Sequence, residues 1–203
     1  MKIAIVTAGS GEQSALVVSQ IADALAAADG SVEVSVIRLR DYVQDLASAL
    51  TALAPERLRQ VFEEVSEADA VVLHTSIMNA SFAGLLKVFL DVLPEGTLRG
   101  APILMVGTGG TPRHSLALDY ALRPVLTYLH AEPIPTTVFV ATSDWGGGGD
   151  GVRSVGERIT EAARELLAAA SAAPVARPRA RVEAASQMGS FDIAHITDRP
   201  KDL

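Results

Sequence analysis

The stretch Ile3-Ala4-Ile5-Val6 near the start of the chain is a continuous apolar run, and similar runs recur at Ala70-Val71-Val72-Leu73 and at Ile103-Leu104-Met105-Val106. Such runs predict parallel strands that helices cover on both faces. Residues 32–37 alternate between apolar and polar side chains, which predicts a strand at the edge of the sheet. Residues 134–140 supply a fifth predicted strand.

Helical spacing of apolar residues fills the intervals between these strands. The first predicted helix carries Val17, Ile21 and Leu25 on one face and follows Ser14, a candidate N-cap residue. Of the other predicted helices, one has Pro55 in its first turn, one spans residues 84–93, one begins near Ser115, and one spans residues 152–170. A further short helix is predicted at residues 45–53.

This strict alternation of strands and helices predicts an α/β fold with a doubly wound parallel sheet. With five strands, we expect the flavodoxin-like strand order 2-1-3-4-5. Residues 1–173 then form one domain, and residues 174–203 form a tail rich in proline and arginine. The sequence leaves two alternatives for that tail: an arm that docks on a neighbouring subunit through Phe191, Ile193 and Ile196, or plain disorder.

The composition excludes several classes of function. The chain has 203 residues, 49% of them hydrophobic, and a formal net charge of −7. An acidic chain of this kind is not expected to bind nucleic acid or an anionic membrane. Because there is no cysteine, disulfides, thiolate catalysis and cysteine-ligated metals are excluded, and we predict no metal site. We find no signal peptide and no membrane-spanning run, so we expect a cytoplasmic protein.

Three loops rich in small and polar residues follow the first, third and fourth strands: residues 7–14, 75–81 and 107–114. Open α/β sheets bind ligands at the carboxyl ends of their strands, beside the point where the strand order reverses. The sequence therefore predicts a ligand site where these three loops meet.

The first loop joins a strand to the N-terminus of a helix, where free N–H groups and the helix dipole favour a phosphate. Gly9, Ser10 and Ser14 are its candidate binding residues. The loop has neither the GxGxxG spacing of a dinucleotide fold nor the GxxxxGK[ST] of a P-loop. A plain tight turn capped by Ser14 is the alternative.

The third loop contains two adjacent glycines, Gly109 and Gly110. Glycines let the backbone approach a flat ligand closely and present unobstructed N–H groups, which suits an isoalloxazine ring. His114 follows at the start of the next helix, where a histidine is more often a capping residue than a catalyst.

The segment from Gly107 to Leu126, GTGGTPRHSLALDYALRPVL, closely resembles the TGGT…H…DYAL+PVL segment of the NADPH-dependent FMN reductase family. It is most similar to two-component reductases that supply reduced flavin to monooxygenases. SFAGLLKVFLD at residues 81–91 and DWG at residues 144–146 also resemble the family's pattern. The resemblance extends over about residues 1–170.

This resemblance implies a flavodoxin-like fold, FMN bound at the three loops, and hydride transfer from NAD(P)H to the flavin N5 atom. The cofactor would carry the chemistry, so no side-chain acid or base is required, although His114 is a possible participant. The resemblance implies that five residues of the third loop face the flavin ring: Thr108, Gly109, Gly110, Thr111 and His114. It implies that the other side of the ring is lined by Ser76, Ile77, Met78 and Asn79. It also implies that Ser81 fixes that second loop and that Asp144 closes the site.

The resemblance also implies a homodimer or homotetramer, and a flavin-dependent monooxygenase as the partner. In two-component members, the tyrosine that matches Tyr120 lies in a bulged helical turn at a subunit interface. Pro124 independently favours a kink or bulge, because proline removes a helical hydrogen bond. An ordinary helix that tolerates a proline is the alternative.

The chain departs from the family at several positions. The first loop lacks the arginine that many relatives place near the phosphate and has Glu12 instead, and the second loop has Ser76, Met78 and Asn79 at positions that are often proline, aromatic and basic. These changes weaken FMN binding. Either the flavin turns over as a substrate and is released, or the site has changed its function. The alternatives are an FMN-retaining quinone or azo reductase, and a flavin-poor accessory subunit or electron carrier.

Overall fold

The structure is a computed structural model that describes residues 1–145 and 153–173. Its sheet has the strand order β2-β1-β3-β5-β6, and all four pairings along this path are parallel. The strands are β1 (Lys2–Thr7), β2 (Glu33–Arg38), β3 (Ala70–Met78), β5 (Pro102–Gly109) and β6 (Glu132–Ala141). The predicted order 2-1-3-4-5 and the edge position of the second strand are confirmed.

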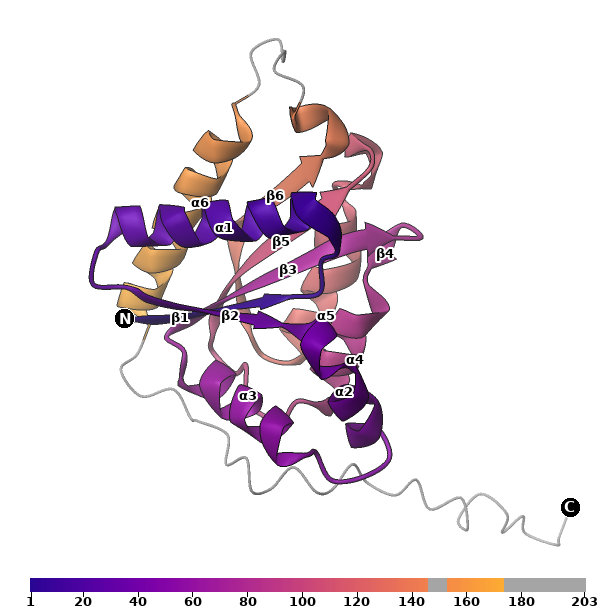
Figure 1. Cartoon of the computed structure of the whole chain (residues 1–203). Helices are drawn as coiled ribbons and strands as arrows, with labels where there is room; N and C mark the ends of the chain where they lie inside the picture. The colour runs from indigo at the N-terminus through magenta and orange to yellow at the C-terminus, as the bar shows by residue number, and fades with distance from the viewer. Residues whose placement is uncertain (146–152, 174–203) are drawn as a thin grey trace, which may run out of the picture.

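Helices cover both faces of the sheet (Figure 1). On one face lie α1 (Gly11–Ala28) and α6 (Val155–Ala172), and on the other lie α3 (Glu56–Glu67), α4 (Gly84–Val92), α5 (Arg123–Tyr128) and the short α2 (Val43–Ala49). Each face has its own apolar core, because alternate residues of the strands point to opposite sides. Because the strands of β2-β1-β3-β5-β6 are parallel, their carboxyl ends all lie at the same end of the sheet, which we call its carboxyl edge.

Two predicted helix starts are wrong. Ser14 is not an N-cap, because α1 begins three residues earlier with Ser10 as its N-cap residue, and the Ser14 side chain is buried. Pro55 is the N-cap residue of α3 and not a residue of its first turn. The short helix expected at residues 45–53 begins and ends earlier, at Val43 and Ala49, after a 3₁₀ turn, η1 (Leu39–Tyr42).

The predicted second loop is largely strand. Residues 75–78 extend β3 beyond the neighbouring β1, and the chain folds back as β4 (Ser81–Phe82), which pairs antiparallel with β3. Asn79 and Ala80 connect the two strands with φ values of 49° and 62°. Positive φ at both residues is what a two-residue type I′ hairpin turn requires. The sequence lacks the usual glycine of such a turn, so the hairpin was missed.

The bulge expected upstream of Pro124 is confirmed. A 3₁₀ turn, η2 (Pro112–His114), is followed by a π-helical turn, η3 (Leu118–Leu122), which contains Tyr120 and leads directly into α5. Pro124 lies within the first two residues of α5, where its missing N–H is tolerated. The single continuous helix expected from Ser115 is therefore divided.

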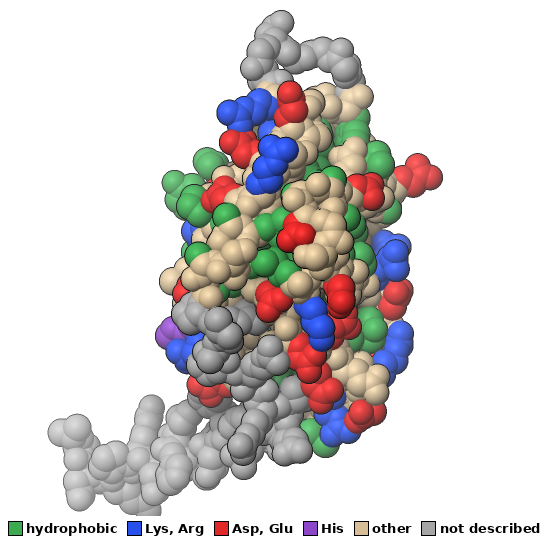
Figure 2. Space-filling model, turned by 90° about the vertical axis from the view of Figure 1, so that its left-hand side faces the viewer, with side chains coloured by type: hydrophobic (Ala, Val, Ile, Leu, Met, Phe, Trp, Pro, Cys, Tyr) green, Lys and Arg blue, Asp and Glu red, His purple; other side chains and the backbone are tan. Residues whose placement is uncertain are grey.

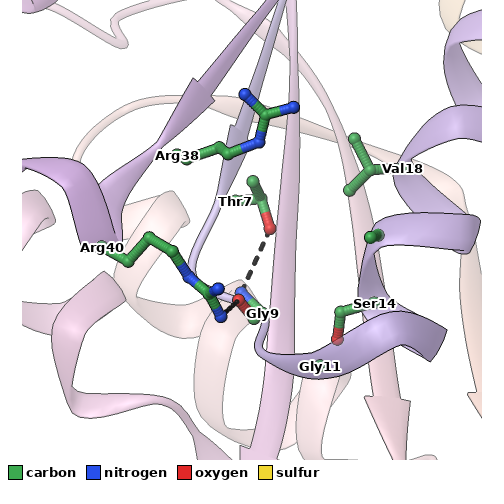
Figure 3. A pocket seen from close by; sticks show the side chains of 8 residues that line it. Thr7, Gly9, Gly11, Ser14, Val18, Arg38 and Arg40 are labelled. Atoms are coloured by element: carbon green, nitrogen blue, oxygen red, sulfur yellow. Dashed lines mark hydrogen bonds between the residues drawn. The ribbon is translucent and has the colours of Figure 1, made fainter.

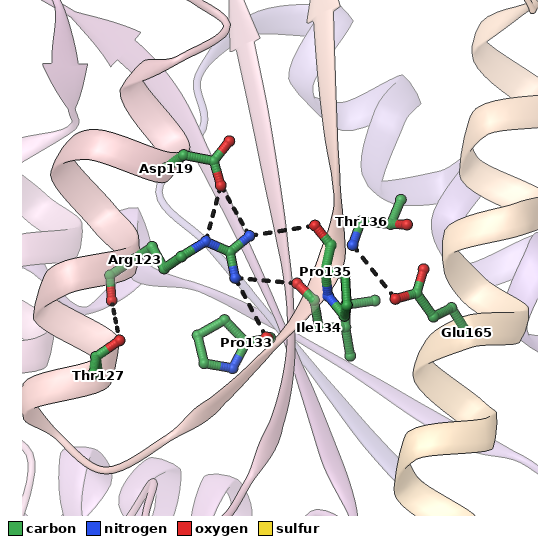
Figure 4. A network of polar contacts seen from close by, with 8 residues as sticks. All are labelled: Asp119, Arg123, Thr127, Pro133, Ile134, Pro135, Thr136 and Glu165. Atoms are coloured by element: carbon green, nitrogen blue, oxygen red, sulfur yellow. Dashed lines mark hydrogen bonds and ion pairs between the residues drawn. The ribbon is translucent and has the colours of Figure 1, made fainter.

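Arg123 fastens the π-helical turn to β6 (Figure 4). Its Nε donates to Asp119 Oδ1 at 2.9 Å, and its two terminal nitrogens donate to the backbone oxygens of Pro133, Ile134 and Pro135 at 3.2 to 3.4 Å. These carbonyls lie at the irregularity in the pairing of β6 with β5, between the pairs Ile103–Pro133 and Met105–Thr137, where two prolines remove ladder donors. The guanidinium thus satisfies acceptors that the sheet leaves open.

Charges of both signs lie close together on the surface. Figure 2 shows one face on which acidic and basic side chains are interspersed. Lys2 and Glu67 are one such pair, with 3.3 Å between Nζ and Oε2. None of the described helices is long and apolar enough to cross a membrane. The predicted tail at residues 174–203, and the start of the helix predicted from residue 152, lie outside the described residues.

Candidate functional site

Three hydroxyl groups join the loops at the carboxyl edge of the sheet. Ser14 Oγ in α1 lies 3.1 Å from Thr108 Oγ1 in β5 and 3.4 Å from Ser76 Oγ in β3. The N–H of Ser10 donates to Ser76 Oγ at 3.2 Å. The structure thus brings together four of the predicted site residues, one or more from each loop. Ser14 and Thr108 are buried, so their hydrogen bond joins the first and third loops inside the protein.

The first loop rests on a buried histidine, His74. A Cβ atom added to Gly9 would lie 2.2 Å from His74 Cε1 and 2.8 Å from Ser14 Cβ, so only glycine fits here. His74 Nδ1 bonds to Thr7 Oγ1 at 2.7 Å, and Thr7 Oγ1 accepts the N–H of Gly9 at 3.1 Å. Burial lowers the pKa of His74 to about 4, so its ring is neutral. Thr7 and His74 were not among the predicted site residues.

The first turn of α1 is free to bind an anion. The first N–H groups of an α-helix have no partner within the helix, and Ser10 provides no side-chain cap here. Gly11, with a φ of 82°, turns the chain sharply into the helix, and the Glu12 side chain is exposed. A phosphate group at this helix N-terminus stays a prediction, and the backbone geometry is compatible with it.

The third loop presents bare backbone at the same edge. A Cβ on Gly109 would lie 2.9 Å from Phe139 Cζ and 3.7 Å from Ile77 Cβ, whereas a Cβ on Gly110 would meet nothing within 4 Å. Gly109 is therefore packed closely against Phe139, whereas the space around Gly110 is open. Thr111 is the N-cap residue of η2 and accepts the N–H of Arg113 at 3.4 Å. The backbone N–H of His114 donates to the carbonyl of Thr111, and its ring is partly exposed.

The second loop forms the opposite wall. Ser76 and Ile77 are partly buried, whereas Met78 and Asn79 are exposed at the tip of the β3–β4 hairpin. Thr75 Oγ1 accepts the N–H of Ala83 at 2.9 Å and so ties the base of the hairpin to the start of α4. Ser81 lies in β4, opposite Met78, where main-chain pairing fixes it. Ile77 of this hairpin lies close to Gly109, since a Cβ on Gly109 would be 3.7 Å from Ile77 Cβ, so the second and third loops adjoin each other.

Asp144 lies apart from the hydroxyl cluster, in a 3₁₀ turn, η4 (Thr142–Trp145), after β6. Its Oδ2 atom accepts the N–H of Ala141 at 3.1 Å and pairs with Arg158 Nη2 at 2.7 Å. Arg158 also donates to the backbone oxygen of Phe139 at 2.7 Å. The carboxylate therefore anchors the end of β6 to α6.

Two arginines that the sequence analysis missed border the first loop (Figure 3). Arg38 at the end of β2 and Arg40 in η1 line a cavity of about 90 Å³ together with Thr7, Gly9, Gly11, Ser14, Ala15 and Val18. The signal was present: the second strand's carboxyl end lies at the same edge as the others, and the sequence Arg38-Leu39-Arg40 follows it directly. Within residues 1–145 and 153–173, no group of acidic and histidine side chains could hold a metal ion.

A comparison with protein families matches residues 1–146 to the NADPH-dependent FMN reductase family. An FMN reductase (NADPH) from Pseudomonas aeruginosa is 34% identical over 145 residues, which cover 71% of this chain and 75% of the relative. An NADH-dependent FMN reductase from Pseudomonas putida, SfnE, is 35% identical over 109 residues, 53% of this chain and 59% of the relative.

Solved structures agree with this match. An oxidoreductase from Corynebacterium diphtheriae has a TM-score of 0.78 and 36% identity, covering 84% of this chain and 96% of its own. The NADH:FMN oxidoreductase EmoB has a TM-score of 0.70 and 25% identity, covering 90% and 96%. A Streptococcus pneumoniae flavodoxin, at 19% identity and a TM-score of 0.56 over 83% of this chain and 99% of its own, shows the flavodoxin-like fold alone. The chain belongs to the NADPH-dependent FMN reductase family, an oxidoreductase family that uses FMN and NAD(P)H.

Proposed function

We propose that this chain reduces FMN with NAD(P)H in the cytoplasm and passes the reduced flavin to a flavin-dependent monooxygenase, with residues 1–173 as the reductase domain. The observation that carries the proposal is the convergence of the three loops through Ser14, Ser76 and Thr108. Their junction lies between a helix N-terminus that suits a phosphate and an open glycine pair that suits a flat ring. Membership in the NADPH-dependent FMN reductase family supports reduction of FMN by NAD(P)H as the reaction at this junction.

The residues of this chain bind and orient, since no acid or base is needed. Bound FMN supplies hydride acceptance at its ring. The N–H groups at the start of α1 would hold the phosphate of FMN, and the backbone at Gly109 and Gly110 would contact its ring. The second loop would contribute Ser76, Ile77, Met78 and Asn79, with Ser81 holding the hairpin and Asp144 holding the end of β6. Thr108, Thr111 and His114 complete the third loop.

The second loop favours release of the flavin. Met78 is 57% exposed and follows Ser76 and Ile77, so residues 76–79 include no aromatic side chain, whereas an aromatic residue is usual in relatives at the position of Met78. Loss of stacking on that aromatic ring weakens binding by roughly 0.5–1.5 kcal/mol. Flavin that dissociates readily acts as a substrate, which suits a reductase that supplies a second enzyme.

The test is a steady-state assay of the purified full-length chain. We expect nearly colourless protein whose NAD(P)H oxidation depends on added FMN and saturates with it. Protein that purifies yellow and turns over only with a quinone or azo acceptor would be an FMN-retaining reductase instead. Protein that oxidises neither NADH nor NADPH with any flavin would be an accessory subunit, and the proposal would be wrong.

We further propose that the chain forms a homodimer or homotetramer through the π-helical turn. Tyr120 is 79% exposed there, with exposed Leu116 one turn earlier. Replacing Tyr120 with Ala should shift the protein to a smaller species, because large exposed apolar side chains of this kind are typical interface anchors. Size-exclusion chromatography with light scattering measures this, and Leu53→Ala, at an exposed apolar position that lies outside the π-helical turn and α5, is the comparison. An unchanged mass for Tyr120→Ala would place the interface elsewhere.

A further inference from the structure

Arg38 and Arg40 are held in fixed positions beside the first loop. Arg38 pairs in register with Thr7 across β2 and β1, and fully buried Leu39 anchors the segment between the two arginines. The following turn is fixed by Arg57, whose Nη1 donates to the backbone oxygen of Asp41 at 3.0 Å. The backbone that carries the two guanidinium groups is therefore well supported.

Neither guanidinium is neutralised within the described part of the chain. The ion pairs formed by described residues include Arg57, Arg59, Arg123, Arg153 and Arg158, but not Arg38 or Arg40. Among the described residues, the single hydrogen bond of these two side chains runs from Arg40 Nη2 to the carbonyl oxygen of Gly9 at 3.4 Å. Two uncompensated cations thus adjoin the loop in a chain whose net charge is −7.

The cavity between these arginines and α1 is small, and the two arginines are the charged residues that line it. Figure 3 shows Arg38 and Arg40 on the β2 side, Ser14 and Gly11 on α1, and Thr7 between them. Its volume of about 90 Å³ leaves room for a phosphate group. Thr7 and Ser14 are among the lining residues, and Gly11 and Ala15 contribute little side-chain bulk to the lining.

We infer that Arg38 and Arg40 form a phosphate-binding subsite that takes the phosphate monoester of FMN and distinguishes FMN from riboflavin. The subsite rests on the proposed function and supplies the charge that the first loop lacks, since that loop contains Glu12 and no arginine. Arginine suits the role because its planar, permanently charged fork bonds phosphate oxygens in pairs. Contact of Arg40 with Gly9 places that charge against the loop that leads into the N-terminus of α1.

The test compares flavin affinities by quenching of flavin fluorescence, which needs no turnover. The variants are Arg40→Ala and the double variant Arg38→Ala/Arg40→Ala. We expect the dissociation constant for FMN to rise by roughly 10- to 100-fold, as for loss of a charge-assisted hydrogen bond. The dissociation constant for riboflavin, which has no phosphate, should change by less than about twofold. Arg59→Ala, which removes the same charge from a residue of α3 that does not line the cavity, is the matched control and should leave both constants unchanged.

Three results would overturn the subsite. Equal weakening of FMN and riboflavin would mean that the arginines only support the loop. An unchanged affinity for FMN would remove them from the site. A rise confined to the KM for NADPH, with NADH and FMN unaffected, would assign the cations to the phosphate of the dinucleotide. Because these titrations measure binding directly, failure of the subsite can be distinguished from failure of the proposed function, in which the wild-type protein binds FMN but does not reduce it.

Discussion

Replacing Gly9 with alanine should lower the free energy of unfolding by about 3 kcal/mol or more and abolish measurable FMN binding. The added Cβ would lie 2.2 Å from His74 Cε1 and 2.8 Å from both His74 Nδ1 and Ser14 Cβ. Neither neighbour can retreat, since His74 is fully buried and Ser14 is 4% exposed. The loop itself must move outward. That movement breaks the bond from Gly9 N–H to Thr7 Oγ1, and it displaces the start of α1, where we place the flavin phosphate.

Urea unfolding and FMN fluorescence titration measure the two effects separately. Gly156→Ala is the matched control, because a Cβ at Gly156 in α6 meets nothing within 4 Å. In a helix this change should be neutral or stabilising by up to about 1 kcal/mol. If Gly9→Ala unfolds and binds FMN as the wild type does, the tight contact between the first loop and His74 does not exist in solution.

The sequence predicted the sheet well because its signals were local and repeated. Continuous apolar runs marked β1, β3 and β5, and alternation correctly placed β2 at an edge. Pro124 predicted the bulge that the structure shows as a π-helical turn, because a proline inside a helix removes one main-chain hydrogen bond. The β3–β4 hairpin escaped notice because Asn79-Ala80 adopts positive φ without a glycine.

Prediction of the site was less complete for a different reason. Gly9, Ser76 and Thr108 were found from small, polar loops after strands, and the structure places all three at one edge. Arg38 and Arg40 follow an edge strand, and only the parallel pairing of β2 with β1 brings them to the first loop. His74 lies within an apolar run, where nothing in the sequence distinguishes a supporting residue from an ordinary strand residue. The signal for the two arginines lay in the predicted strand order, which puts β2 beside β1, and not in the local pattern of residues 38–40 alone.

His74 should make the stability of the protein depend on pH. Among the described residues its charged form has no acidic partner: Nδ1 bonds to the neutral Thr7 hydroxyl, and Nε2 is buried without a hydrogen-bond partner. Burial accordingly lowers the pKa of His74 from 6.5 to about 4. In the unfolded chain the same imidazole regains its ordinary pKa of about 6.5.

The sign of the effect follows from proton uptake. Between a pH of about 4 and about 6.5 the unfolded state binds one more proton at this residue than the folded state, so the free energy of unfolding falls as the pH is lowered. Above about pH 7 the contribution is constant, because the imidazole is neutral in both states. Lowering the pH from about 7.5 to about 5 should therefore cost roughly 2 kcal/mol at this site.

His74→Asn isolates that contribution from the titration of other groups. Asparagine keeps a polar atom near the position of Nδ1, so it can still bond to Thr7 Oγ1, but it has no proton to gain over this range. Urea unfolding of both proteins at a series of pH values should show wild-type stability declining by about 2 kcal/mol more than that of the variant. The absolute stability of the variant is not the readout, since any repacking shifts it equally at every pH. Parallel curves for the two proteins would mean that water or an acceptor reaches Nε2 in solution, and that the first loop does not rest on a neutral, fully desolvated ring.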